Sequence, residues 1–469
     1  MNKENIHNTL VELIRRTSAF LPCDVERIIA RHKHLEEPRS KAELALNLVT
    51  QNIGIAKTRS LPICQDTGTI TFYMKTPIHV NHIDLQKTAE AAVVQATEMG
   101  YLRQNSVDSL TGKNSGNNLG PGTPVFHFDQ WDRETIDIRL ILKGGGCENT
   151  SAQYKLPATL NGRLFGRDLA GVKACILDAV YQAQGKGCSP GFLGVCIGGD
   201  RATSYEWAKH QLLRKVDDVN PVPELAELEE QIIKEANQLE IGPMGFGGKL
   251  TVGSCKIGSR NRLPACFFVS IAYMCWAYRR RGVILTRDGD VVEWLYQKTE
   301  EFENESKGPE TFHIPKTDVK ILNTPVSEEE IRSLDAGDVV LINGTIFTGR
   351  DAVHKYLYEG GNMDSIRGGI IYHCGPVILK KETGYEVIAA GPTTSIREEP
   401  YEAAIIEKFA IKAVIGKGGM GAKTLKACQD FGAVYLHAIG GAAQVYARAI
   451  KEVVGVRLEQ FGSPEAVWE

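Results

Sequence analysis

The stretch Pro62-Ile63-Cys64-Gln65-Asp66-Thr67-Gly68 places a thiol, an amide, a carboxylate and a hydroxyl side by side. It lies between a helical pattern and the β-rich run Thr69–Met74. A carboxylate is costly to bury in an apolar core unless it is paired. The stretch is therefore better suited to holding a metal and a polar substrate than to filling a core.

The composition of the whole chain excludes several classes of protein. Its 469 residues are 43% apolar and 24% charged, as in soluble globular proteins, and predict two domains. The net charge of −3 argues against nucleic acid as a partner. The longest apolar run, Cys266–Ala277 broken only by Ser270, is too short to span a membrane, and Met1–Asn5 shows no apolar signal region. We expect a cytoplasmic protein.

The eleven cysteines are spread from Cys23 to Cys428, and none forms a Cys-x-x-Cys pair. Disulfides are not expected in a long chain without a signal region. Zinc ribbons and ferredoxin-type clusters use close cysteine pairs, so the spacing disfavours them. A metal site in this chain has to gather cysteines that are distant in sequence.

Periodicity predicts a mixed α/β chain in two domains. The proposed boundaries are residues 1–295, a charged linker at 296–318 with little periodic apolar content, and 319–469. Short strands bounded by glycines dominate the second domain. Helices are expected at 5–58, 84–100, 169–183, 203–214, 223–239, 400–411, 423–431 and 440–452, and strands at 136–140, 192–197, 339–342, 370–372, 387–389 and 414–415.

Three glycine clusters, at 144–146, 245–248 and 416–421, free backbone amides to face an anion. Tight turns are the simpler explanation for the first two. The third, Gly416-Lys417-Gly418-Gly419-Met420-Gly421, matches a dinucleotide-binding pattern between a strand and a helix. However, the next strand, Val434–His437, ends without the acidic residue that holds a ribose. A small carboxylate therefore fits this loop better than a nucleotide.

Three cations in the second domain stand beside glycines or hydroxyls: Arg350, Arg397 and Lys417. Arg397 follows the hydroxyl cluster Thr393-Thr394-Ser395, for which a helix N-cap is the alternative explanation. Each cation taken alone is typical of a surface charge. Taken together, they predict recognition of more than one carboxylate.

Cys64, Cys188 and Cys275 are weak metal-ligand candidates when each is considered alone. A cysteine is more often a small buried hydrophobe than a ligand. The polar neighbours of Cys64 and the glycine-rich turn before Pro190 that carries Cys188 favour a ligand role, whereas Cys275 lies in an apolar run.

Eight motifs together resemble those of class I, iron–sulfur fumarate hydratases, with the α-type and β-type parts fused in one chain. Each motif is weak alone, but all eight occur in the family's order, and the resemblance runs from about residue 5 to Glu469. The motifs are Cys64-Gln65-Asp66-Thr67-Gly68, Lys143-Gly144-Gly145-Gly146, Ile197-Gly198-Gly199-Asp200, Gly242-Pro243-Met244-Gly245, Asn343-Gly344-Thr345, Gly349-Arg350-Asp351, Gly391-Pro392-Thr393-Thr394 and Gly416-Lys417-Gly418-Gly419-Met420-Gly421.

The resemblance implies a [4Fe–4S] cluster held by Cys64, Cys188 and Cys275, with one iron left free to act as a Lewis acid without redox. The exposed iron further implies sensitivity to oxygen. The resemblance also implies fumarate and L-malate as substrates, a homodimer, and a C-terminal β/β/α domain that swivels over a cluster-bearing, helix-rich domain with antiparallel and mixed sheets. Proton transfer falls to Thr393 assisted by Asp66. Carboxylate binding falls on Gln65, Arg103, Gly146, Arg350, Arg397 and Lys417.

One position departs from the family pattern. The family carries a substrate-contacting histidine twelve residues before the third cysteine, where this chain has Leu263, which cannot hydrogen-bond a carboxylate. Arg262 beside it is a candidate replacement. L-tartrate dehydratase and mesaconate hydratase activities, which use the same chemistry, are therefore alternatives. An inactive iron–sulfur sensor is a remote one, disfavoured because Thr393, Asp66, Arg397 and Lys417 are all present.

Overall fold

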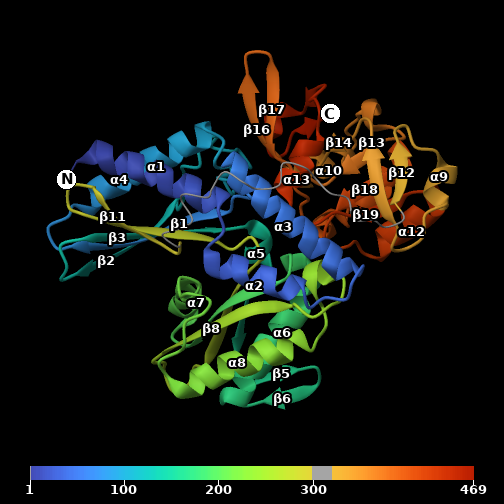
Figure 1. The fold of residues 1–469 in the computed structure, drawn as a ribbon. Coiled ribbons are helices and arrows are strands. Elements are labelled where there is room, and N and C mark those ends of the chain that lie inside the picture. Colours follow the sequence, from blue (N-terminus) through green and yellow to red (C-terminus); the bar gives the residue numbers. More distant parts are fainter. Residues whose placement is uncertain (1, 298–318) are drawn as a thin grey trace. The chain divides into compact units, whose positions relative to one another are not determined.

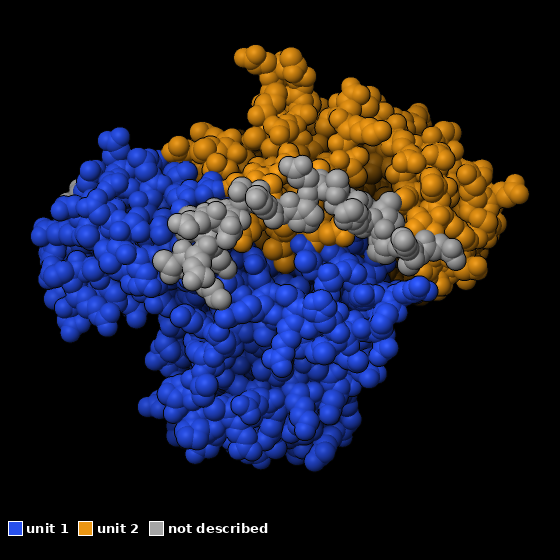
Figure 2. All heavy atoms as spheres, viewed as in Figure 1, with its two compact units in different colours: residues 1–50, 68–92, 124–305 blue, residues 51–67, 93–123, 306–469 orange. Residues whose placement is uncertain are grey.

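The computed structural model describes residues 2–297 and 319–469, which form two compact units. Unit 1 comprises residues 1–50, 68–92 and 124–305, and unit 2 comprises residues 51–67, 93–123 and 306–469 (Figure 2). The division falls inside two helices, α3 (Lys41–Arg59) and α4 (His82–Glu98). The predicted linker, 296–318, lies outside the described residues except for its first two positions.

A five-stranded sheet in unit 1 has the order β11-β10-β3-β1-β2. β1 and β2 are parallel, and the other neighbours are antiparallel. Helix α1 (Lys3–Ala19) lies across this sheet (Figure 1), because Ile6, Leu10 and Leu13 recur at helical spacing and are fully buried. The strands are β1 Thr69–Pro77, β2 Val125–Trp131, β3 Ile136–Lys143, β10 Arg279–Leu285 and β11 Val291–Leu295.

A four-stranded sheet in unit 1 has the order β4-β9-β7-β8, and only the β7–β8 pair is parallel. Helices α6 (Leu169–Ala183) and α8 (Pro223–Asn237) bury their apolar faces in one core with this sheet. The remaining elements of the unit, in which η denotes a 3-10 helix, are α2 Cys23–Lys33, α5 Gly145–Asn149, β4 Ala152–Lys155, β5 Ala158–Leu160, β6 Arg163–Phe165, η1 Gln184–Gly187, β7 Gly191–Gly198, α7 Arg201–Gln211, η2 Pro243–Gly245, β8 Val252–Arg260 and β9 Phe268–Met274.

The centre of unit 2 is a parallel sheet with the order β14-β15-β18-β19. Successive strand residues face opposite sides. Ile371 and Val414 join a core with α10, α11 and α12, whereas Ile370 and Ala413 join a core with β12 and β13. Helices therefore cover one face, and a two-stranded parallel sheet covers the other.

The bounds of the unit 2 elements are β12 Val319–Asn323, α9 Glu328–Arg332, β13 Val339–Asn343, β14 Phe347–Thr348, α10 Asp351–Tyr358, η4 Asp364–Ile366, β15 Ile370–Tyr372, β16 Val377–Lys381, β17 Gly384–Ala389, η5 Ser395–Glu398, α11 Glu402–Phe409, β18 Ala413–Gly416, α12 Ala422–Phe431, β19 Val434–His437, α13 Ala443–Ala449, β20 Val456–Arg457, η6 Glu459–Phe461 and β21 Val467–Trp468. The hairpin β16–β17 stands out from the rest of the unit (Figure 1).

The mixed α/β class predicted from the sequence is confirmed, but strand β10 is not predicted by the sequence pattern. It opens with three arginines, Arg279–Arg281, which look like the exposed end of an apolar run yet are all buried. Arg280 Nη2 lies 2.5 Å from Asp24 Oδ2, and such pairing makes a buried charge tolerable.

Among the described residues, we find no helix with the length and apolar character needed to span a membrane.

Candidate active site

Cationic side chains in unit 2 follow the carboxyl ends of parallel strands. Arg350 follows β14 and Lys417 follows β18, on either side of β15, after which His373 comes. Loops converge at this edge of a parallel sheet, which is why ligands commonly bind there. The topology thus brings two predicted carboxylate-binding residues to the same edge.

The loop that carries Thr393 is fixed to this edge by backbone hydrogen bonds. Thr393 N donates to the carbonyl of His373 at 2.6 Å, and Lys417 N donates to the carbonyl of Thr393 at 3.2 Å. Ser395 N donates to the carbonyl of Lys417 at 3.0 Å. Thr394 is the N-cap of η5, but its side chain makes no capping hydrogen bond. Helix capping therefore does not account for the hydroxyl of Thr394.

Asp351, to which no role was assigned from the sequence, links the two predicted arginines. Its Oδ2 lies 3.0 Å from Arg397 Nη2 and 3.7 Å from Arg350 Nη2. Arg397 Nη2 also donates to Thr393 Oγ1 at 3.0 Å. Burial lowers the pKa of Arg350, but the carboxylates of Glu465 and Asp351 raise it, so that its pKa lies above the ordinary value. Asp351 therefore links the charged Arg350 to Arg397, whose guanidinium contacts the threonine hydroxyl.

The stretch from Cys64 to Thr67 also belongs to unit 2. Asp66 Oδ1 pairs with Arg103 Nη2 at 3.2 Å, and Arg103 Nη1 donates to the carbonyl of Gly375, in the loop after β15, at 2.8 Å. Burial lowers the pKa of Arg103, and Asp66 offsets part of that effect. Two predicted site residues are thus paired directly.

Gln65 connects this stretch to the Thr393 loop. Its Nε2 donates to the carbonyl of Pro392 at 3.1 Å, and its Oε1 accepts from Cys64 Sγ at 3.4 Å. A Cβ atom at Gly391 would lie 2.2 Å from Gln65 Oε1, so only glycine leaves room for the amide. Unit 2 contains these predicted site residues: Cys64, Gln65, Asp66, Arg103, Arg350, Thr393, Arg397 and Lys417.

Unit 1 contains the other two predicted cysteine ligands, and it brings them together. The carbonyl of Cys188 accepts a hydrogen bond from the backbone of Trp276, the residue after Cys275, at 3.3 Å. Both thiols are buried, and both lie close to Tyr273, whose pKa is raised well above its ordinary value by burial and by nearby cysteines, these two included. Two soft sulfur donors at one place are the donor set that iron–sulfur clusters use.

Glycines shape the turn that carries Cys188, which has a left-handed backbone with φ of 51°. A Cβ atom at Gly187 would meet the ring of Tyr273 at 2.5 Å. At Gly185 it would lie 2.3 Å from the carbonyl oxygen of Met244, in the Gly242–Gly245 motif. That motif therefore forms a turn packed against the turn that carries Cys188.

Gly146, a predicted substrate-binding residue, lies in unit 1 in the short helix α5. The preceding Lys143 is buried and pairs with Glu148 at 3.0 Å. A Cβ atom at Gly68 would lie 2.5 Å from the carbonyl carbon of Lys143, so the last residue of the Pro62–Gly68 stretch has to be glycine. The Lys143–Gly146 motif is thus held by close backbone packing.

Leu263, where the family pattern has histidine, is 70% exposed in the loop between β8 and β9. The guanidinium of Arg262 donates to the carbonyls of Leu263, Pro264 and Cys266 at 3.1 to 3.2 Å. The arginine therefore braces its own loop.

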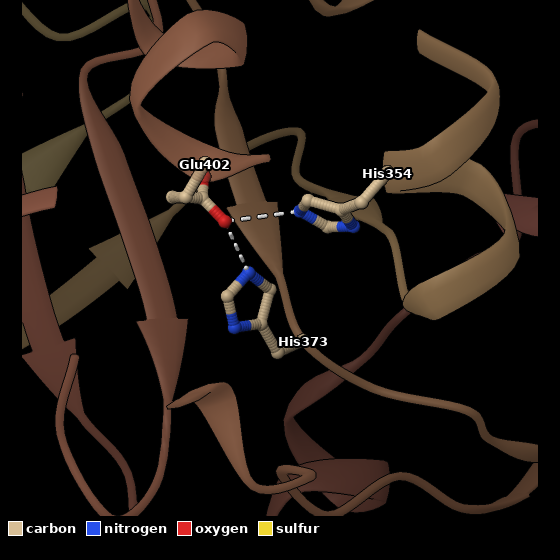
Figure 3. A group of neighbouring side chains, drawn as sticks. All are labelled: His354, His373 and Glu402. Atoms are coloured by element: carbon tan, nitrogen blue, oxygen red, sulfur yellow. Dashed lines mark hydrogen bonds and ion pairs between the residues drawn. The ribbon is translucent and has the colours of Figure 1, made fainter. Parts of the chain in front are cut away.

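Unit 2 also holds a group that sequence reasoning missed: His354, His373 and Glu402 (Figure 3). All three are fully buried, and one potential ligand atom from each lies within 4.8 Å of the others, so that the group could hold a metal ion. The residues come from α10, the loop after β15 and the start of α11. No local motif joins such distant positions.

The sequence of the chain matches the models of two known protein families. Residues 7–284 match the family model described as fumarate hydratase (Fumerase), and residues 289–469 match the one described as fumarase C-terminus. A protein from Geobacillus stearothermophilus, provisionally named class I fumarate hydratase, is 54% identical over 472 aligned positions. That alignment covers 99% of this chain and 92% of the relative.

More distant relatives are separate subunits. The L(+)-tartrate dehydratase subunit alpha of Escherichia coli (strain K12) is 28% identical over 61% of this chain and 94% of its own length. The beta subunit of the same name from that strain is 37% identical over 32% of this chain and 75% of its own length.

Proposed function

Because the chain belongs to the fumarate hydratase family, and is thus an enzyme of the hydro-lyase class, we propose that it reversibly adds water across fumarate to give L-malate, a step of the tricarboxylic acid cycle. The observation that carries the proposal is the chain of contacts Arg350–Asp351–Arg397–Thr393 at the edge of the parallel sheet. It places the Thr393 hydroxyl beside Arg397, with Arg350 linked to Arg397 through Asp351, a combination suited to a dicarboxylate that exchanges a proton.

The proposed cofactor is a [4Fe–4S] cluster held by Cys64, Cys188 and Cys275. The neighbouring thiols of Cys188 and Cys275 support this donor set, and Cys64 is a buried thiol of the same type. When bound through three cysteines, such a cluster supplies one Lewis-acidic iron that polarises a hydroxyl without redox.

Substrate carboxylates are assigned to Arg350, Arg397 and Lys417, with Gln65, Arg103 and Gly146 as further contacts. A guanidinium binds a carboxylate through two parallel hydrogen bonds, which orients the ligand as well as attracting it. The ion pairs to Asp351 and Glu465 support this role because they hold the arginine forks in place before substrate arrives.

Thr393 is proposed to exchange the carbon-bound proton through Oγ1, with Asp66 as the assisting carboxylate. A threonine hydroxyl is a weak base at neutral pH. The hydrogen bond that the hydroxyl accepts from Arg397 supports the assignment, because the positive charge of the guanidinium beside Oγ1 favours loss of the hydroxyl proton. A deprotonated Oγ1 can then take the proton from carbon.

We also propose a domain organisation for the whole chain. A cluster-binding α-type domain at 1–295, with antiparallel and mixed sheets, is joined through 296–318 to a swivelling β/β/α domain at 319–469. The layers of unit 2, two strands on a parallel sheet on helices, support the second assignment. A homodimer and a cytoplasmic location complete the proposal.

A second candidate function is dehydration of tartrate, favoured by the matches to both subunits of a tartrate dehydratase and by Leu263 at the family's histidine position. Mesaconate hydration remains a third variant of the same chemistry. Steady-state assays after anaerobic reconstitution, with fumarate, L-malate, mesaconate and the tartrates, separate the candidates. We expect fumarate and L-malate to be turned over with the highest kcat/KM. A hundredfold preference for a tartrate contradicts the proposal.

A further inference from the structure

We propose that Glu402, His354, His373 and Ser395 form a buried relay that positions Arg350 at one end and the Thr393 loop at the other. These four are then positioning residues for the reaction. The inference rests on the proposed function, in which Arg350 and Thr393 act on the substrate.

Glu402 is the centre of the relay. Its Oε2 lies 3.0 Å from Nε2 of His373 and 3.1 Å from Nε2 of His354 (Figure 3). All three side chains are 0% exposed. A carboxylate removed from water persists only where partners replace the water, and here two imidazoles do so. One buried charge thus joins α10, the loop after β15 and α11.

The His354 side of the relay leads to Arg350. His354 Nδ1 lies 2.9 Å from the carbonyl oxygen of Arg350. A carbonyl only accepts, so Nδ1 carries a hydrogen, and Nε2 faces a carboxylate that also only accepts. Burial lowers the pKa of His354, whereas Glu402 and Glu398 raise it, with a net pKa of about 9. His354 is therefore an imidazolium that ties the backbone of Arg350 to Glu402.

The His373 side leads to the Thr393 loop. Burial lowers the pKa of His373 below its ordinary value although Glu402 raises it, so the ring is neutral at pH 7. Its Nε2 donates to Glu402, which leaves Nδ1 to accept from the hydroxyl of Ser395 at 2.9 Å. Ser395 Oγ in turn accepts from the hydroxyl of Tyr435 at 3.1 Å. The carbonyl of His373 also accepts from Thr393 N.

The backbone around the relay is fitted to it. A Cβ atom at Gly416, the last residue of β18, would lie 1.7 Å from Ser395 Oγ and 3.2 Å from His373 Nδ1. Any larger residue at this position would push Ser395 away from the imidazole. Glu402 is joined to His373 by a hydrogen bond of 3.0 Å and to His354 by an ion pair of 3.1 Å, so the relay needs no metal ion to hold it together.

The two ends of the relay predict different kinetic defects in the reconstituted holoenzyme. His354→Gln loosens Arg350, a group that binds the substrate carboxylate, so KM for fumarate should rise about tenfold with kcat nearly unchanged. Ser395→Ala loosens the Thr393 loop, so kcat should fall about tenfold with KM nearly unchanged. A residue that only stabilises the fold would not split the two parameters in this way.

The matched control is Tyr446→Phe, which removes another buried hydroxyl of unit 2, an acceptor for Ile439 N at 2.7 Å. It should leave both kinetic parameters unchanged. Equal losses of kcat in His354→Gln, Ser395→Ala and the control, in proportion to the folded fraction, overturn the relay. So does one equivalent of zinc or another non-iron metal that wild type binds and His354→Gln loses, which would make the group a metal site.

Binding of succinate, measured by calorimetry, separates failure of the relay from failure of the proposed function. If wild type does not hydrate fumarate, the function is wrong, yet weaker succinate binding in His354→Gln than in Tyr446→Phe still supports the relay. If His354→Gln and Ser395→Ala do not fold, Tyr435→Phe removes only the hydroxyl that donates to Ser395. We expect about a threefold lower kcat in that variant, and an unchanged kcat overturns the relay.

Discussion

The cysteine turns of unit 1 and the charged cluster of unit 2 are held in place by opposite means. Around Cys188, glycines let backbone and ring come into direct contact, as Gly187 does with Tyr273. Around Glu402, buried charges fix the side chains. Close packing tolerates no added atom, whereas a buried ion pair tolerates no lost partner. We expect that loss of a thiol ligand removes the cluster and all activity together. Changes among the charged groups should lower kcat or raise KM by amounts that differ from residue to residue.

The largest effect is expected from Cys188→Ala in unit 1. Loss of one of three proposed cluster ligands should abolish both the visible absorbance of the cluster and all activity. Cys175→Ala is the matched control, because Cys175 is a buried cysteine on α6 whose pKa burial raises to about 12, as expected of a structural thiol. Full absorbance in Cys188→Ala would remove that residue from the ligand set.

The next largest effect is expected from Thr393→Ala in unit 2. The variant should retain cluster absorbance, because no proposed ligand changes, while kcat falls by about three orders of magnitude through loss of the proton-transfer group. Thr393→Ser keeps the hydroxyl that Arg397 contacts and should retain much of the rate. A wild-type kcat in Thr393→Ala would exclude the hydroxyl from the mechanism.

A smaller effect is expected where one ion pair is weakened. Asp351→Asn keeps the size of the side chain but removes the charge between Arg350 and Arg397, so KM for fumarate should rise about tenfold. Asp364→Asn, which breaks an exposed pair with Arg367 in the same unit, should change nothing measurable. An unchanged KM in Asp351→Asn would show that the arginines are positioned without it.

The contrast between the units also explains what the sequence could predict. Amphipathic helices such as α1 and α6 follow from periodicity, and Arg350, Thr393 and Lys417 stand in glycine or hydroxyl motifs that mark them. Glu402 lies on a helix where a glutamate normally faces solvent, and only folding brings it to His354 and His373. Residues whose roles depend on distant partners have no local signal.

The division of the chain carries the same lesson. Residues 51–67 and 93–123 group with the C-terminal part in unit 2, although they precede most of unit 1 in sequence. Asp66 and Arg103 show why these segments belong to unit 2. Their side chains form an ion pair, and Arg103 also donates a hydrogen bond to the carbonyl of Gly375. Contacts of this range follow from tertiary packing, which no window of sequence contains.

The smallest expected effect concerns the pH dependence of stability at His354. Its pKa of about 9 lies above the ordinary value of 6.5, so its protonated form is favoured in the fold. The stabilisation is fully present below pH 6.5 and is lost as pH rises through 9. At 1.36 kcal/mol per pKa unit, it amounts to about 3 kcal/mol. Wild type should therefore lose stability relative to His354→Gln between pH 6 and pH 10.

The difference between these two proteins is the informative quantity, because other groups also titrate in this range. Buried cysteines and tyrosines ionise only in the unfolded chain, which destabilises both proteins alike above pH 9. Glu398, with a pKa raised to about 7 by burial, lies 3.9 Å from the His354 ring and is largely titrated below pH 8. Thermal midpoints of the two proteins should therefore converge by several degrees as pH rises from 8 to 10. A gap that stays constant would mean that His354 is neutral in the fold and forms no ion pair with Glu402.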